Sequence, residues 1–141
     1  LERSVEKPSC EERSSKATTP LARRLFDLID AKKSNLCVSV DVETTQELLS
    51  LADKLGPSIC LLKTHVDILK DFSSDTIDGL KSLSSKHNFL LFEDRKFSDI
   101  GNTVESQYSG GLYRIFDWAH LVTVHGISGP GVIEGSLIFQ A

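Results

Sequence analysis

The chain has 141 residues, a formal net charge of −4 and no Met. This length suits one domain or part of one, and the negative charge gives no general attraction to nucleic acid or anionic membrane surfaces. No apolar run approaches the roughly 18 residues of a membrane span, and the charged, Ser-rich start differs from a signal peptide. We therefore expect a cytoplasmic protein, and the missing initiator Met indicates a piece of a longer chain.

The three cysteines, Cys10, Cys37 and Cys60, include no C-x-x-C pair. Cys37 and Cys60 lie inside apolar, strand-like runs, so we expect reduced thiols in the core. The pattern favours neither a zinc site nor a disulfide framework.

Residues 1–18 are rich in charged and hydroxyl side chains and poor in apolar ones. We expect them to form a linker or N-terminal arm, and residues 19–141 to form the folded part. Thr19 followed by Pro20 is typical of a helix N-cap and first helical position, and leucines then recur at helical spacing. A helix is therefore predicted from Pro20 onward.

From Asn35 the chain alternates between short apolar runs and amphipathic segments. Strands are predicted at 36–41, 59–63, 89–94 and 121–125. Three segments between or after them have helical signals: a Thr44/Glu47 capping box with a stop at Gly56-Pro57, a cap at Ser74, and a helix ending at Gly110-Gly111. A last helix follows Gly129-Pro130-Gly131. Strands that alternate with helices predict an α/β fold with a parallel sheet.

Four such units fit either a doubly wound open sheet or a (β/α)8 barrel. A complete barrel has about 250 residues. If the fold is a barrel, we expect about half of it in this chain.

Charged side chains follow three of the predicted strands directly: Asp41 the first, Lys63 the second, and Asp94 with Lys96 the third. In both architectures, functional groups gather at the C-terminal ends of the strands. Strand alternation predicts that Asp94 and Lys96 share one face, as do Ser39 and Asp41. We therefore expect a site at this edge of the sheet.

Lys96 lies in the sequence between two aspartates, Asp94 and Asp99, and Asp99 must come from the loop or helix that follows the strand. Neighbouring carboxylates keep a lysine protonated, so that it can donate a proton and stabilise a developing carbanion. The alternative is a structural network of ion pairs at the edge of the sheet.

Three motifs carry a family resemblance. Residues 94–104 read D-R-K-F-S-D-I-G-N-T-V, residues 39–41 read S-V-D, and residues 63–67 read K-T-H-V-D. Together they resemble the orotidine 5′-monophosphate decarboxylase family over about residues 20–135, and most of all its eukaryotic members. These include the decarboxylase half of bifunctional uridine monophosphate synthase.

The resemblance implies a (β/α)8 TIM barrel, here about its first four β/α units plus an N-terminal helix. It implies decarboxylation of orotidine 5′-monophosphate to uridine 5′-monophosphate in de novo pyrimidine biosynthesis, without cofactor or metal. It also implies a homodimer in which Asp99 and Thr103 reach the partner's site. The implied catalytic residues are Lys63, Asp94, Lys96 and Asp99, and the implied substrate-binding residues are Ser39, Asp41, Lys63, Thr64, His65, Lys96, Asp99 and Thr103.

Two alternatives stay open at this point. The chain is an inactive fragment that acts by pairing with other subunits, or it is a related phosphosugar decarboxylase, which the K-T-H motif argues against. The family's phosphate-binding Arg lies in later loops that this chain lacks. The N-terminal arm is compatible with a preceding phosphoribosyltransferase domain.

Overall fold

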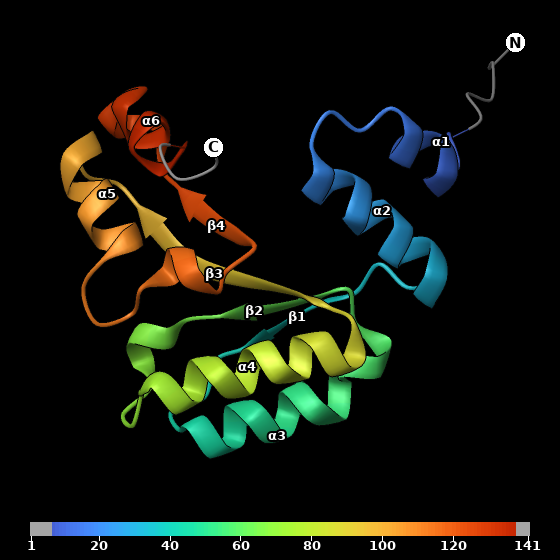
Figure 1. The fold of residues 1–141 in the computed structure, drawn as a ribbon, viewed down its shortest axis with the longest axis horizontal. Helices are drawn as coiled ribbons and strands as arrows, with labels where there is room; N and C mark the ends of the chain where they lie inside the picture. Colours follow the sequence, from blue (N-terminus) through green and yellow to red (C-terminus); the bar gives the residue numbers. More distant parts are fainter. Residues whose placement is uncertain (1–6, 138–141) are drawn as a thin grey trace, which may run out of the picture.

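The computed structural model describes residues 7–137, so residues 1–6 of the predicted arm lie outside the described part. In this described part, six α-helices alternate with or flank four strands (Figure 1). The helices are α1 (Cys10–Ser15), α2 (Pro20–Lys32), α3 (Thr45–Leu55), α4 (Ser74–His87), α5 (Gly101–Ser109) and α6 (Gly131–Leu137), and the strands are β1 (Cys37–Val40), β2 (Leu61–Thr64), β3 (Leu90–Phe97) and β4 (Leu121–Val124).

The strands form one parallel sheet in the order β1-β2-β3-β4, as predicted. Two rows of residues in register cross the whole sheet, and the row nearer the C-terminal ends of the strands is Val40, Thr64, Glu93 and Val122. Beyond that row the pairing of β3 with β4 shifts, because Phe97 pairs with Val124. The segment between Glu93 and Phe97 is therefore bulged, and it carries Asp94 and Lys96.

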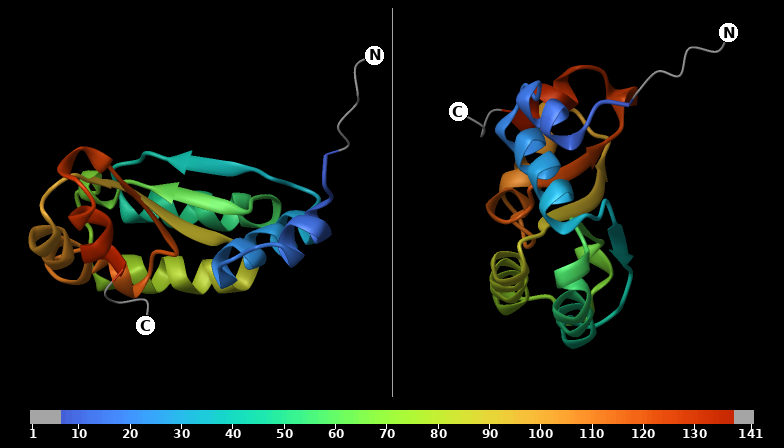
Figure 2. Two further views of the ribbon diagram at one scale, coloured as in Figure 1. Left: turned by 90° about the horizontal axis from the view of Figure 1, so that it is seen from above. Right: turned by 90° about the vertical axis from the view of Figure 1, so that its right-hand side faces the viewer.

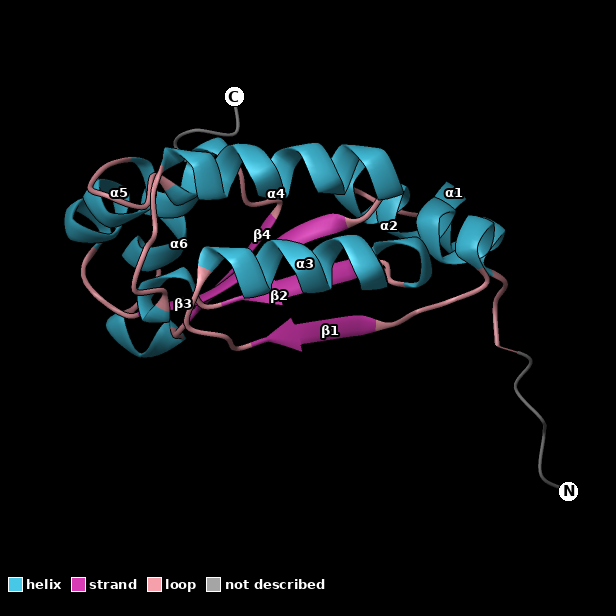
Figure 3. Ribbon diagram, turned by 90° about the horizontal axis from the view of Figure 1, so that it is seen from below, coloured by secondary structure: helices cyan, strands magenta, loops and turns pink. Residues whose placement is uncertain are grey.

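The main hydrophobic core lies on one face of this sheet. Alternate strand residues such as Leu62 and Leu91 point into it, together with Leu48 of α3, Leu80 of α4 and Val104 of α5. Figures 1 and 3 show α3 and α4 side by side along this face. A doubly wound sheet carries helices on both faces, whereas a barrel carries them on its outer face only. The packing therefore favours the barrel architecture.

Helix α2 covers the N-terminal ends of the strands rather than either face (Figure 2). Its Leu28 is buried in a second cluster with Cys60 and Leu90, and Leu25 packs against that cluster. The end of the sheet opposite the charged residues is thus closed by apolar side chains.

The predicted helix starts are confirmed with two adjustments. The Thr19 hydroxyl accepts a hydrogen bond from the Ala22 N–H, and Thr44 caps α3 in the same way. The Glu47 carboxylate, however, accepts from the Thr44 hydroxyl at 2.9 Å, so the reciprocal half of that capping box is missing. The cap of α4 is Ser73, one residue before the predicted Ser74.

The polar segment before Pro20 contains structure that its composition did not predict. Ser9 and Glu12 form a capping box at the start of α1. This helix packs on α2, where the Ser14 hydroxyl donates to Asp27 at 2.6 Å. Its buried contact is polar, which explains why hydrophobic periodicity gave no signal. A linker role for residues 1–18 stays a prediction.

The cysteines are free, and Cys60 is buried as predicted, but Cys37 is exposed. The prediction of a core thiol at Cys37 is wrong, because this residue lies on the sheet face opposite the main core. Among the described residues, no helix has the length and apolarity required to cross a membrane.

Candidate active site

Four polar side chains lie directly beyond the row nearer the C-terminal ends of the strands, which runs from Val40 to Val122. They are Asp41, His65, Asp94 and Thr123, and each follows one member of that row. Because the strands are parallel, their C-terminal ends meet at one edge. This placement confirms the predicted gathering of Asp41, Lys63, Asp94 and Lys96 at that edge.

Asp94 lies between two lysines. Its Oδ2 is 2.8 Å from Lys96 Nζ and 3.2 Å from Lys63 Nζ. The Asp94 and Lys63 side chains are mostly buried, at 15% and 18% exposed, whereas the Lys96 side chain is 50% exposed. Lys96 therefore keeps a free side that a ligand in the site can approach.

The surroundings of Asp94 strongly favour its charged form. The Lys96 ammonium, followed by the Thr123 hydroxyl and Lys63, lowers the pKa of Asp94 far below its ordinary range. Thr123 donates to Asp94 Oδ1 at 2.8 Å and accepts from the Lys96 N–H at 2.8 Å. Sequence analysis missed this residue. The signal was available, since Thr123 is the one polar residue in the apolar run of β4.

Asp94 and Lys96 meet, but not for the predicted reason. Simple strand alternation does not hold in the bulged segment, and Lys96 has a left-handed backbone with φ 54°. This conformation is strained for a residue with a Cβ, and such strain concentrates at functional sites. An irregular backbone therefore sets the position of the Lys96 ammonium.

Ser39, Asp41 and His65 surround Lys63. The Ser39 hydroxyl lies 3.1 Å from both carboxylate oxygens of Asp41, which confirms that the two side chains share a face. Lys63 Nζ is 3.0 Å from His65 Nε2 and 3.9 Å from Asp41 Oδ1. The positive and negative groups thus alternate from Asp41 through Lys63 to Asp94 and Lys96. These four residues and His65 form the charged cluster.

The structure leaves three predicted site residues apart from this cluster. Asp99 is exposed, and its carboxylate accepts from the Ile100 N–H at 2.8 Å. Thr103 lies on α5, where its N–H donates to Asn102. Thr64 is buried on the opposite face of the sheet, where its hydroxyl donates to Glu93. In the described part of the chain, none of these three side chains forms a hydrogen bond or ion pair with Lys63, Asp94 or Lys96.

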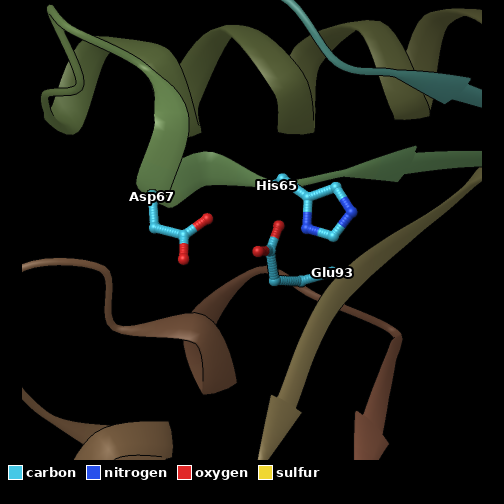
Figure 4. A group of neighbouring side chains, drawn as sticks. All are labelled: His65, Asp67 and Glu93. Carbon is cyan, nitrogen blue, oxygen red and sulfur yellow. The ribbon is translucent and has the colours of Figure 1, made fainter.

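Glu93 is a second residue that sequence analysis missed. It is fully buried beneath the cluster, and burial raises the pKa of Glu93 to about 7. Figure 4 shows its carboxylate beside His65 and Asp67, and one potential ligand atom from each of these residues lies within 4.8 Å of the others. In the described part of the chain, this group alone has the composition of a metal site. Both Glu93 oxygens, however, already accept hydrogen bonds from Thr64 or Val66.

Comparison with known proteins identifies the family of the chain. The model of the orotidine 5′-phosphate decarboxylase / HUMPS family matches residues 34–137. The chain belongs to this family. The matched residues include all four strands and every residue of the charged cluster.

Curated relatives agree with the assignment. The chain is 59% identical over 132 residues to the orotidine 5′-phosphate decarboxylase of Candida parapsilosis, which covers 93% of this chain and 49% of the relative. It is 56% identical over 132 residues to that of Saccharomyces cerevisiae, with the same shares. The chain therefore spans about half the length of the curated relatives that it matches.

Two solved structures show the same fold. A Toxoplasma gondii structure described as an orotidine-monophosphate-decarboxylase superposes with a TM-score of 0.62 at 21% identity, covering 82% of this chain and 44% of that one. A Streptomyces avermitilis structure gives a TM-score of 0.60 at 20% identity and covers 86% and 49%. The chain thus has the fold of about half a (β/α)8 barrel, as predicted.

Proposed function

We propose that this chain is the half of an orotidine 5′-monophosphate decarboxylase that supplies the charged groups of the reaction. The observation that carries the proposal is the continuous contact from Lys63 through Asp94 to Lys96 at the C-terminal edge of the sheet. The enzyme would be a lyase that forms uridine 5′-monophosphate in pyrimidine biosynthesis. A cytoplasmic location stays a prediction from the sequence.

In this mechanism, the carbon–carbon bond to the substrate carboxylate breaks and CO₂ leaves, so the electron pair stays on the ring carbon. The Lys96 ammonium stabilises that negative charge and then transfers a proton to the carbon. Asp94 Oδ2 lies 2.8 Å from the ammonium and holds it from one side. The half-exposed side of Lys96 is the side on which the ring would lie.

Ser39, Asp41, Lys63 and His65 would bind the ribose or base, because they line the same edge and offer both donors and acceptors. Asp99 and Thr103 are exposed or half-buried and lie beyond β3. Their separation from Lys96 within one subunit supports a role in the site of a partner subunit, and so a homodimer.

A hybrid barrel tests the proposed reaction. In this hybrid, the present chain replaces the matching first half of the Candida parapsilosis relative, to which it is 59% identical. We expect the hybrid to decarboxylate orotidine 5′-monophosphate, measured as the loss of substrate absorbance. A hybrid that unfolds cooperatively and binds the nucleotide, but shows no turnover, would contradict the proposal.

Mixed dimers of the hybrid barrel test the shared site. An Asp99→Ala subunit and a Lys96→Ala subunit are each expected to be inactive as homodimers. Mixed together, they should recover activity, because each mixed dimer contains one site with both residues intact. If isolated mixed dimers stay inactive, Asp99 acts within its own subunit.

A further inference from the structure

Glu93 places a carboxylate in the core directly below the charged cluster. It is 0% exposed and pairs in register with Thr64 of β2 and Val122 of β4, on the face opposite Lys63 and Asp94. Burying an ionisable carboxyl group is costly unless it is well hydrogen-bonded. In the same row, the two outer strands β1 and β4 carry aliphatic residues, Val40 and Val122. The acid therefore requires an explanation beyond packing.

The Glu93 carboxylate accepts its hydrogen bonds from the segment that directly follows Lys63. The Thr64 hydroxyl donates to Oε2 at 2.7 Å, and the Val66 N–H lies 3.2 Å from Oε1 and 3.3 Å from Oε2. These two donors flank His65, whose ring contacts both Lys63 and Asp94. The buried Glu93 carboxylate thus holds the backbone on both sides of His65.

The position of Glu93 in β3 completes the connection. Asp94 follows Glu93 directly in the chain. The Glu93 carboxylate holds segment 64–66, and the Asp94 carboxylate accepts from Lys63 and Lys96. We propose that Glu93 is a positioning residue: through Thr64 and Val66 it fixes the end of β2 against β3, and so holds Lys63 and His65 at their distances from Asp94. Its effect on the rate rests on the proposed function, whereas its effect on geometry does not.

Two substitutions separate positioning from charge. Glu93→Ala removes both hydrogen bonds. Glu93→Gln keeps an acceptor for the Val66 N–H and can donate to the Thr64 oxygen, since the Thr64 hydroxyl can turn toward the Phe92 carbonyl, 3.5 Å away. In the hybrid barrel, we expect Glu93→Ala to lower kcat by about 100-fold with little change in KM, because small misplacements of reacting groups are that costly. Glu93→Gln should retain kcat within about threefold.

Two further variants complete the series. Thr64→Val removes one of the two donors, and we expect a kcat between those of the Gln and Ala variants. Leu80→Ala is the matched control for lost stability, because Leu80 is also 0% exposed but lies on α4 within the apolar core. Leu80→Ala should lower the melting temperature and leave kcat unchanged well below that temperature.

Two outcomes of this series count against positioning. If Glu93→Ala behaves like Leu80→Ala, the role of Glu93 is only structural. If Glu93→Gln loses as much activity as Glu93→Ala, the charge of Glu93 acts directly. Either result overturns the proposal.

Crystal structures of the hybrid barrel and its Glu93→Ala variant test the geometry without any activity measurement. We expect Lys63 Nζ to move away from Asp94 Oδ2, which it approaches to 3.2 Å with Glu93 present. An unchanged distance in the variant would overturn the positioning role even if the hybrid is active. A changed distance in a hybrid that has no decarboxylase activity would support the role of Glu93 and contradict only the proposed function.

Discussion

Asp94 joins the charged side chains that the structure brings to the edge of the sheet. It lies 2.8 Å from Lys96 and 3.2 Å from Lys63, and Thr123 holds its second oxygen. A carboxylate shared by two ammonium groups leaves one of them, Lys96, half exposed and charged. This arrangement supplies a positive charge next to the space where a substrate would bind, which suits a reaction that develops negative charge.

The substitution Lys96→Ala in the hybrid barrel should therefore lower kcat by at least about 1000-fold, because it removes the group that stabilises the transition state. Binding of the product nucleotide should stay measurable by calorimetry, since the groups around Lys63 remain. Lys86→Ala is a matched control, because Lys86 is exposed on α4 and pairs with Asp53. Turnover near the parental value in Lys96→Ala would remove Lys96 from the proposed mechanism.

Glu93 should make stability depend on pH in a defined window. Its pKa rises from the ordinary value of 4.5 to about 7 in the folded state, mainly through burial. Between these values the folded protein holds a proton that the unfolded chain has lost, so stability from this group is present below pH 4.5 and is lost as pH rises to 7. Glu93→Gln lacks this loss, which amounts to on the order of 3 kcal/mol.

We expect the melting temperature of the Glu93→Gln hybrid to exceed that of the parent hybrid. The difference should grow as the pH rises from 4.5 to about 7 and then level off. Differential scanning calorimetry in a series of buffers measures this difference. A constant difference across the series would mean that Glu93 is charged throughout in the folded protein.

At the scale of elements, β3 and β4 are joined by more than their regular ladder. The regular pairing is interrupted between Glu93 and Phe97, and Thr123 bridges the gap through the Lys96 N–H and the Asp94 carboxylate. The left-handed Lys96 backbone is held in this gap. A single hydroxyl on β4 therefore supports the strained segment that presents both charged residues.

Thr123→Val keeps the shape of this side chain and removes both hydrogen bonds. In the hybrid barrel, we expect a stability loss of about 1 kcal/mol and a larger relative loss in kcat than in nucleotide binding, because the segment around Lys96 loses its support. Thr123→Ser, which keeps the hydroxyl, should restore most of the activity. Equal kinetics for the Val variant and the parent would show that the bulge holds its shape without this bridge.

At the scale of the whole molecule, the described sheet ends in two open edges. β1 and β4 are the outer strands, and exposed apolar side chains lie in them or close to their ends along the chain, such as Leu36, Val124 and Ile127. A barrel leaves no open edge, because its first and last strands pair. The half of the barrel in this chain therefore exposes surface that the other half would cover.

Expressed alone, the 141-residue chain should fold poorly and show no measurable decarboxylation. Open strand edges favour aggregation, and the contacts that hold a substrate phosphate in barrels are often built by loops after later strands. Calorimetry and a turnover assay on the purified chain measure both effects. Adding the second half of the Candida parapsilosis relative as a separate chain should restore part of the activity. A cooperative transition and clear turnover from the chain alone would contradict this expectation.

The order of elements, the parallel sheet and the edge at which charge gathers could all be read from the amino-acid sequence. These follow from local signals: apolar runs of strand length, caps such as Thr19, and charged residues directly after each run. The motif around Lys96 then indicated the family. Each of these features depends on neighbours along the chain, which the sequence displays.

Two features became known only from the folded chain: the side of the sheet that the helices cover, and the polar residues that support the charged cluster. Thr123 and Glu93 act through register between strands far apart in the chain, and the bulge that aims Lys96 depends on the pairing of β3 with β4. The same holds for Gly101, where a Cβ would lie 2.8 Å from the Gly131 carbonyl oxygen at the meeting of α5 and α6. Such contacts are set by packing between elements, and no local pattern of residues encodes them.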